Sequence, residues 1–322
     1  MLPGGRLKKG KAMKKARTPA NALGRKILKW IGIVSAVISL VLGVREVVTM
    51  IQDHIARRDA ARGFMREARS LAASGNYARA EESAKQAVSL DPSQEAGEGE
   101  IAMDWLRNIR LKGTRREESF TDIAEQLLPV LYRAVDTTRP GPAADLFAHI
   151  GWADYLIYRD GDTGVRVDEQ FQHALRLDST NAYANAMEGF WMLYPGHPGG
   201  SLEEAELRFA AALKSGQHTA FVRELIIAAY LNVPSVACRA RILRMVSTMR
   251  GTGDTLDLPE RERILSESYF LYRNDIMTEA SKVLTPQEHL DVFLTLTRGI
   301  DISAKPYLKQ ALRTLRAQAG VE

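Results

Sequence analysis

Apolar residues recur along this chain at helical spacing, and the pattern is most regular between Phe64 and Pro92. On both sides of the dipeptide Gly75-Asn76, apolar side chains follow one another at intervals of three and four residues. Such intervals place side chains on one face of an α-helix, and glycine and asparagine suit a tight turn. The stretch therefore predicts two short amphipathic helices joined by a turn, with Pro92 ending the second helix.

The order of small and large residues in this stretch resembles that of the tetratricopeptide repeat (TPR) family. The residues that carry the resemblance are Phe64, Ala68, Leu71, Gly75, Asn76, Tyr77, Ala80, Ala87, Asp91 and Pro92. Glu67 and Ala84 depart from the family pattern, which usually has an apolar residue at the first position and a large one at the second. An alanine-rich helical hairpin outside the family would show the same period. Because so short a helix pair needs neighbours to bury its apolar face, the resemblance implies an array of pairs.

A second sign of repetition lies between residues 143 and 216. Four pairs of residues share an offset of 38 positions: Gly151 and Gly189, Phe171 and Phe209, Ala174 and Ala212, Leu175 and Leu213. A common offset indicates duplication of a structural unit. Compared with the first repeat, both copies are longer in the inter-helix turns at 159–164 and 195–200. We therefore expect two TPR-like repeats with enlarged turns.

An apolar run from Ile27 to Val44 stands apart from the repeats. It contains one charged residue, Lys29, and at 1.5 Å per residue it would extend about 27 Å, close to the ~30 Å hydrocarbon core of a bilayer. The run predicts an uncleaved transmembrane signal-anchor helix. A buried core helix and a cleaved signal peptide are the alternatives.

The basic residues are concentrated before this run. Residues 1–29 hold ten of the 44 lysines and arginines and no acidic residue, so residues 30–322 carry 34 basic and 39 acidic side chains. The positive-inside rule then predicts a single-pass protein with its N-terminus in the cytoplasm and its repeat domain across the membrane, in the periplasm if the source is bacterial. Because the body of the chain is net acidic, no nucleic-acid partner is expected.

A short apolar stripe follows the predicted membrane helix. Val44, Val48, Ile51 and Ile55 succeed one another at spacings of four, three and four residues. The stripe would allow two copies of the chain to pair as a coiled coil and form a homodimer. It lasts under two heptads, however, so a single continuous stalk helix is the favoured interpretation.

Taken together, the patterns predict an all-α protein, a TPR-like helical-hairpin solenoid preceded by a single N-terminal transmembrane helix. Its basic first segment has too few large apolar side chains to fold. The predicted segments are a disordered tail (1–26), the transmembrane helix (27–44), a stalk helix (45–60), the first TPR-like repeat with a degenerate helix pair (61–137), two 38-residue TPR-like repeats (143–216) and degenerate pairs that close the solenoid (217–322).

The sequence offers no catalytic constellation. Its six histidines show no metal-ligand spacing, and Cys238 has no histidine near it in sequence. The segment Asp160-Gly161-Asp162 lacks the closing glutamate of a calcium loop. We therefore expect no enzyme, no catalytic residue, no metal and no cofactor.

In the TPR family the first helix of each repeat lines a concave groove. The resemblance assigns to such a groove Arg62, Met65, Arg66, Arg69, Asp145, His149, Trp152, Tyr155, Tyr183, Met187, Phe190 and Tyr194. Arginines on one helix face would grip a carboxylate, and aromatic residues would anchor apolar side chains. Alternatively, the aromatic residues pack between repeats and the arginines meet lipid. The expected function is a membrane-tethered scaffold that binds a protein or peptide partner and assembles a membrane-associated complex. A small-molecule receptor or an enzyme built on an α-solenoid is the alternative.

Overall fold

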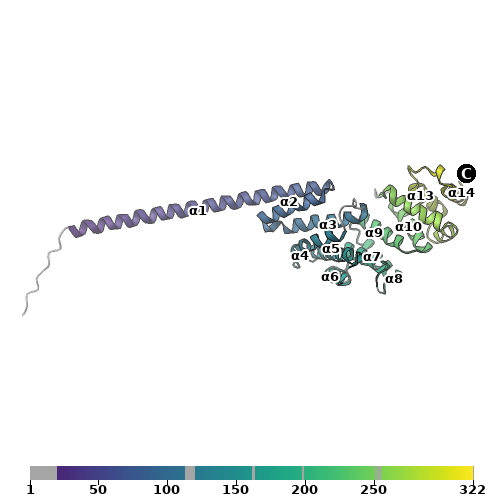
Figure 1. Ribbon diagram of the computed structural model, residues 1–322, viewed down its shortest axis with the longest axis horizontal. Helices are drawn as coiled ribbons and strands as arrows, with labels where there is room; N and C mark the ends of the chain where they lie inside the picture. The colour runs from purple at the N-terminus through teal and green to yellow at the C-terminus, as the bar shows by residue number, and fades with distance from the viewer. Residues whose placement is uncertain are drawn as a thin grey trace, which may run out of the picture. The chain divides into compact units, whose positions relative to one another are not determined.

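The computed structural model describes residues 20–112, 120–161, 164–197, 199–250, 252 and 255–321 (Figure 1). Every regular element in these residues is a helix, which confirms the predicted all-α class. The chain divides into two compact units, residues 1–61 and residues 62–322.

The first unit contains most of helix α1 (Ala20–Ala73), which passes without a break through the apolar run and the stalk. Helix α1 is long and apolar enough to cross a membrane. Its described side chains from Leu28 to Ala60 are all exposed. The tail was expected to be disordered to residue 26, but residues 20–26 are helical, because alanine, leucine, arginine and lysine favour helix once the following run has formed it. Residues 1–19 lie outside the described residues.

The second unit is built from the end of α1 and thirteen further α-helices among the residues that the structure describes. Their bounds are α2 (Tyr77–Leu90), α3 (Glu95–Lys112), α4 (Phe120–Ala134), α5 (Pro140–Arg159), α6 (Val167–Leu177), α7 (Ala182–Met192), α8 (Leu202–Lys214), α9 (Thr219–Asn232), α10 (Val236–Met249), α11 (Leu258–Ser266), α12 (Ile276–Ala280), α13 (Pro286–Leu296) and α14 (Pro306–Ala319). Short 3-10 turns lie at Pro92–Gln94 and Ile302–Ala304, and a π-helical turn, η2, lies at Glu267–Leu271.

These helices pack mainly against their neighbours in sequence. From α2 to α10 each helix contacts the next, and the odd-numbered helices α3, α5, α7 and α9 also contact one another in order. Figure 1 shows this group in blue to green, with α10, α13 and α14 at the C-terminal end. One apolar core extends from α3 to α14. The odd-numbered helices therefore form one layer, and α4, α6 and α8 contact it in turn.

The first helix pair has the turn that its sequence predicts. Helix α1 ends at Ala73, Gly75 has φ +80°, and α2 begins at Tyr77. A positive φ is open to glycine because it lacks Cβ. A small separate core joins the end of α1 to α2 and α3, and five of its seven residues are alanines. Small side chains here let the two helices approach closely.

The C-terminal third is helical and includes a π-helical turn. Helix α11 ends at Ser266 and continues as the π-helical turn η2, and helix α12 ends at Ala280. The start of α13 follows its sequence, because Thr285 and Glu288 form a reciprocal capping box. Helical periodicity indicates that a segment is helical, but it does not fix the residue at which the hydrogen bonding changes from α to π.

Candidate functional site

Most residues assigned to the groove lie inside the protein. Seven of the side chains are buried: Met65, His149, Trp152, Tyr155, Tyr183, Met187 and Phe190. Tyr194 is half-buried. The prediction that these residues are accessible anchors for a partner was therefore wrong for the buried side chains.

The aromatic residues are buried because α5 and α7 pack directly against each other. Trp152 and Tyr155 of α5 surround Phe190 of α7, with ring centroids 5.3 and 5.4 Å apart and near-perpendicular ring planes. Edge-to-face pairs of this kind are favourable beyond the area that they bury. Helices α5 and α7 therefore pack against each other through their aromatic side chains.

The three arginines near the end of α1 lie at the surface, and they are already engaged within the chain. Arg69 donates to Glu100 of α3 at 3.1 Å. The Arg66 Nε donates to the backbone oxygen of Arg62 at 3.4 Å. The exposed stretch of α1 thus presents three guanidinium groups, of which that of Arg69 holds a carboxylate of its own chain.

A polar cluster lies on the layer of odd-numbered helices, and Arg107 of α3 is at its centre. The Arg107 guanidinium forms an ion pair with Asp104 and donates to Nε2 of His149 at 3.2 Å. Its Cζ also lies 5.0 Å from the ring centroid of Tyr183, within the range of a cation–π contact. One arginine therefore links α3 to α5 and α7.

The hydrogen bonds of His149 fix its protonation. Its Nδ1 lies 2.7 Å from the backbone oxygen of Asp145, which only accepts, and its Nε2 faces Arg107, which only donates. The ring is therefore neutral, with the proton on Nδ1. Burial, and then the charge of Arg107, lower the pKa of His149 well below its usual range. Because both nitrogens are engaged, His149 cannot serve as a general base in this arrangement.

The cluster continues to α9 through Asp145 and Tyr183. The Asp145 carboxylate accepts from Nδ2 of Asn181 at 2.7 Å, and burial raises the pKa of Asp145 against the opposing effect of that bond. The ring of Tyr183 stacks on His218 at a centroid distance of 4.2 Å. His218 stands just before α9 with a positive φ of 49° and is exposed. The surface of the cluster thus presents an imidazole and an arginine–carboxylate pair.

The sequence assigned Asp145, His149 and Tyr183 to this face but gave no sign of four other members of the cluster, Arg107, Asp104, Asn181 and His218. Arg107 and Asp104 lie on α3, which has no repeat signature, so no register placed them beside α5. Asn181 and His218 come just before α7 and α9. Their positions immediately before two first helices are the signal that would have found them.

A separate cavity lies beside the π-helical turn in the C-terminal third. It has a volume of about 370 Å³ and is lined by Tyr269, Arg273, Asn274, Met277, Tyr307, Gln310, Ala311 and Thr314. The Tyr269 hydroxyl is bonded to Nε2 of His289 at 2.9 Å. Within the described ranges no group of three or more His, Cys, Asp or Glu side chains could hold a metal ion.

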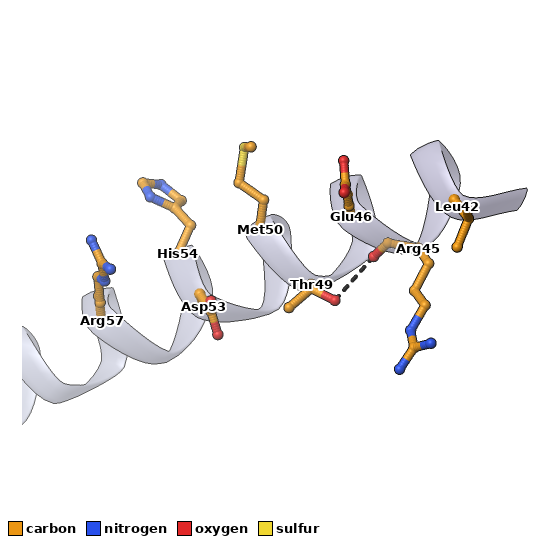
Figure 2. Close-up of a pocket in the computed structure, with 8 residues that line it drawn as sticks. All are labelled: Leu42, Arg45, Glu46, Thr49, Met50, Asp53, His54 and Arg57. Carbon is orange, nitrogen blue, oxygen red and sulfur yellow. Dashed lines mark hydrogen bonds between the residues drawn. The ribbon is translucent and has the colours of Figure 1, made fainter. Parts of the chain in front are cut away.

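The first unit shows a different kind of surface. Figure 2 shows eight residues on one stretch of α1, six of them polar: Leu42, Arg45, Glu46, Thr49, Met50, Asp53, His54 and Arg57. Thr49 donates to the backbone oxygen of Arg45 at 3.0 Å, a bond within the helix. These side chains project from a single helix and do not converge on one point, so they define a polar side of α1 and not a ligand site.

Comparison of the sequence with protein-family models and with curated proteins finds no match. The function is therefore inferred from the helix packing and from the surfaces just described.

Proposed function

We propose that this protein is a membrane-tethered scaffold whose TPR-like helical array binds a protein or peptide partner and assembles a membrane-associated complex. The observation that carries the proposal is the change in side-chain exposure along α1. Its described side chains are exposed up to residue 60, many of them Val, Ile and Leu, and only from Ala61 on do some become buried in a folded unit. A bare apolar helix is costly in water, and a bilayer is the environment that suits one of this length.

The anchor sets the side of the membrane on which the array lies. Nine basic residues precede the apolar run and a tenth, Lys29, lies near its start, so the N-terminus lies in the cytoplasm and the array lies across the membrane, in the periplasm of a bacterial source. A reporter fused after Glu322 tests this orientation. The reporter will be active only on the non-cytoplasmic side, and cytoplasmic activity would contradict the proposed orientation.

Membrane insertion is tested by alkaline extraction of membranes that contain the full-length chain. Wild type will stay in the membrane pellet. A double variant, Ile38→Arg with Leu40→Arg, will move to the supernatant, because each arginine near the centre of a span costs ~2.5–3.5 kcal/mol. The matched control is Met50→Arg, which adds a charge beyond the span and will stay in the pellet. Release of wild type would contradict anchoring.

The partner-binding face is the layer of odd-numbered helices α3, α5, α7 and α9. Its accessible groups, His218 and the Asp104–Arg107 pair, stand over the aromatic packing between repeats. An imidazole and an arginine–carboxylate pair suit a polar peptide segment, because they supply both donors and acceptors. In TPR-like arrays this layer is the concave one, which supports its use for a partner.

The test is crosslinking of the full-length protein in membranes, with the mass and stoichiometry of any bound protein measured. His218→Ala and Asp104→Asn will each lower partner recovery. Arg176→Ala, an exposed change on the even-numbered helix α6, is the matched control and will leave recovery unchanged. Equal recovery from all three variants would move the binding site away from this face.

One observation favours the small-molecule alternative. The cavity of about 370 Å³ borders a π-helical turn, and such turns are frequent at functional sites. A receptor that uses this cavity would show ligand-dependent thermal stabilisation that Gln310→Leu removes.

A further inference from the structure

The apolar stripe of the stalk extends well into the apolar run. Seven positions of α1 alternate at spacings of three and four over 22 residues: Val34, Val37, Val41, Val44, Val48, Ile51 and Ile55. We refer to these seven residues as the β-branched seam. Every member is exposed, with fractions between 46% at Val48 and 60% at Val41. In heptad notation Val34, Val41, Val48 and Ile55 occupy position a, and the other three occupy position d.

The seam is selective for residue type. Within residues 28–55, the leucines at 28, 40 and 42 and the glycines at 32 and 43 all fall outside it. An apolar run of arbitrary order would place leucine, glycine and the branched residues on every face. Here all seven seam positions over three heptads carry a residue that branches at Cβ, and Ile38 and Val47 widen the same face at the flanking positions e and g.

Polar residues occupy the other side of the same helix. The side chains in Figure 2 include Glu46 and Asp53 at position f, directly opposite the seam, and no member of the seam. The seam ends at its next position, which is Arg58. The stalk is therefore amphipathic up to the last turn before the folded unit begins at Arg62.

We infer that the β-branched seam joins α1 to α1 of further copies of this chain in a parallel coiled coil of three strands. The inference rests on the proposed membrane anchoring, because copies inserted with the same orientation are necessarily parallel. Val48, Ile51 and Ile55 lie beyond the span, where lipid does not cover them, and self-association removes their apolar surface from water.

The branching at Cβ favours more than two strands. Isoleucine at both a and d shifts coiled coils from two strands to three or four, and valine shares its branching at Cβ. The flanking positions are compatible with parallel strands, since position g of one strand faces position e of the next heptad on its neighbour. That rule sets His54 against Asp59 of a second copy, and Leu40 against Arg45 of a second copy, with no like charges opposed.

The experiment is a cysteine scan from residue 44 to residue 55 in the full-length protein within native membranes, followed by oxidation. The native Cys238 is buried and serves as the background control. Crosslinked products will peak at residues 44, 48, 51 and 55. Glu46→Cys and Asp53→Cys, matched controls on the opposite side, will give none. Crosslinks that are absent, or that follow no 3.5-residue period, would overturn the inference.

Mass measurement in mild detergent tests the order of assembly. Wild type will have the mass of three chains, and Val48→Asp with Ile51→Asp will reduce it to one. Thr49→Asp with Met50→Asp, which carries the same charges off the seam, will leave the trimer intact. A wild type of one, two or four chains would overturn the three-stranded coil.

Alkaline extraction of the same samples separates the two proposals. Seam-phased crosslinks in a protein that leaves the membrane contradict anchoring alone. An inserted protein without such crosslinks contradicts self-association alone.

Discussion

A Cβ atom added to Gly151 would lie 2.8 Å from Cε1 of Phe171, closer than side-chain atoms approach one another in folded proteins. The relationship recurs 38 residues later, where a Cβ on Gly189 would lie 2.6 Å from Cε1 of Phe209 and 3.1 Å from the backbone oxygen of Ala205. Each glycine stands on the first helix of its pair, and each phenylalanine lies buried on the second. The two glycines therefore allow the backbones of α5 and α7 to contact the phenylalanine rings of α6 and α8, respectively.

Replacing either glycine by alanine is expected to destabilise the protein. The added methyl group displaces a fully packed ring, which costs ~1–3 kcal/mol and outweighs the ~1 kcal/mol gain in helix propensity. Gly189→Ala will lose more than Gly151→Ala, because the new Cβ there also meets backbone. Thermal unfolding of the full-length protein in detergent, followed by circular dichroism, measures both changes.

Gly63→Ala is the matched control. Gly63 is also helical, and nothing lies within 4 Å of where its Cβ would be. This change should raise stability by ~0.5–1 kcal/mol, because alanine loses less conformational freedom on folding. If Gly151→Ala were as stabilising as Gly63→Ala, the close contact with Phe171 would be disproved.

The shared offset of 38 residues identified these pairs from sequence alone. Glycines and phenylalanines at a common interval mark places where two helices approach closely, so the helix pairs and their long turns could be predicted. The burial of Trp152 and Tyr155 could not be predicted. An aromatic residue on a first helix suits both an open groove and a packed interface, and only the distance between α5 and α7 decides which.

Asp154 is a buried carboxyl whose ionisation opposes folding. Burial raises its pKa to about 6, above the ~3.9 of an unfolded aspartate. Because the folded state holds the proton more tightly, the stability this group contributes is full below about pH 4 and is lost as pH rises through 6.

Asp154→Asn should therefore raise stability at pH 7 by ~1–3 kcal/mol and change it little at pH 4. Urea unfolding at the two pH values measures the difference. Unchanged stability at pH 7 would show that the Asp154 carboxylate is solvated well enough to ionise without cost.

His289 has the opposite effect on the pH dependence of stability from Asp154. Burial lowers its pKa to about 4, below the ~6.5 of an unfolded histidine, so its contribution is present above about pH 6.5 and is lost as pH falls through 4. His289→Gln should weaken the dependence of stability on pH between 6.5 and 4, which unfolding curves across that range would detect.

A substitution of Tyr269, whose hydroxyl is bonded to His289, serves as the comparison for the His289 variant. Tyr269→Phe removes the partner of His289 Nε2 but leaves the histidine to titrate. Stability should fall by ~1–3 kcal/mol at pH 7 as a buried ring nitrogen loses its hydrogen-bond partner, while the dependence on pH persists. A profile flattened equally by both substitutions would assign the acid sensitivity to the bond and not to the histidine charge.

The polar cluster around Arg107 could not be predicted from the sequence, for a different reason. Its members come from α3, α5, α7 and the start of α9, and only the packing of odd-numbered helices brings them together. A pattern within one helix gives the face of a side chain but not its partner on another helix. His149 shows this, since the sequence assigned it to a face of its own helix while its neutral, fully bonded state depends on Arg107 of another helix.

Arg239 is an arginine buried on α10 that serves the end of another helix. Its guanidinium donates to the backbone oxygens of Tyr230, Leu231 and Val233, where α9 ends, and forms an ion pair with Glu267 of the π-helical turn. The end of a helix leaves carbonyl groups without hydrogen-bond donors, and here the Arg239 side chain donates to three of them. Arg239 therefore connects α9, α10 and the π-helical turn.

Removing this guanidinium should be among the more damaging single changes in the C-terminal third. Arg239→Met should cost ~3–5 kcal/mol, because the carbonyls and the Glu267 carboxylate lose a buried partner together. Arg239→Lys should rescue little of this loss, since an ammonium lacks the planar fork that reaches several acceptors at once. Arg244→Met is the matched control on the same helix, because its pair with Glu288 is half exposed and should be worth less than ~1 kcal/mol. Denaturant unfolding of the three variants ranks these losses, and equal effects at Arg239 and Arg244 would show that the buried guanidinium does not hold the three elements together.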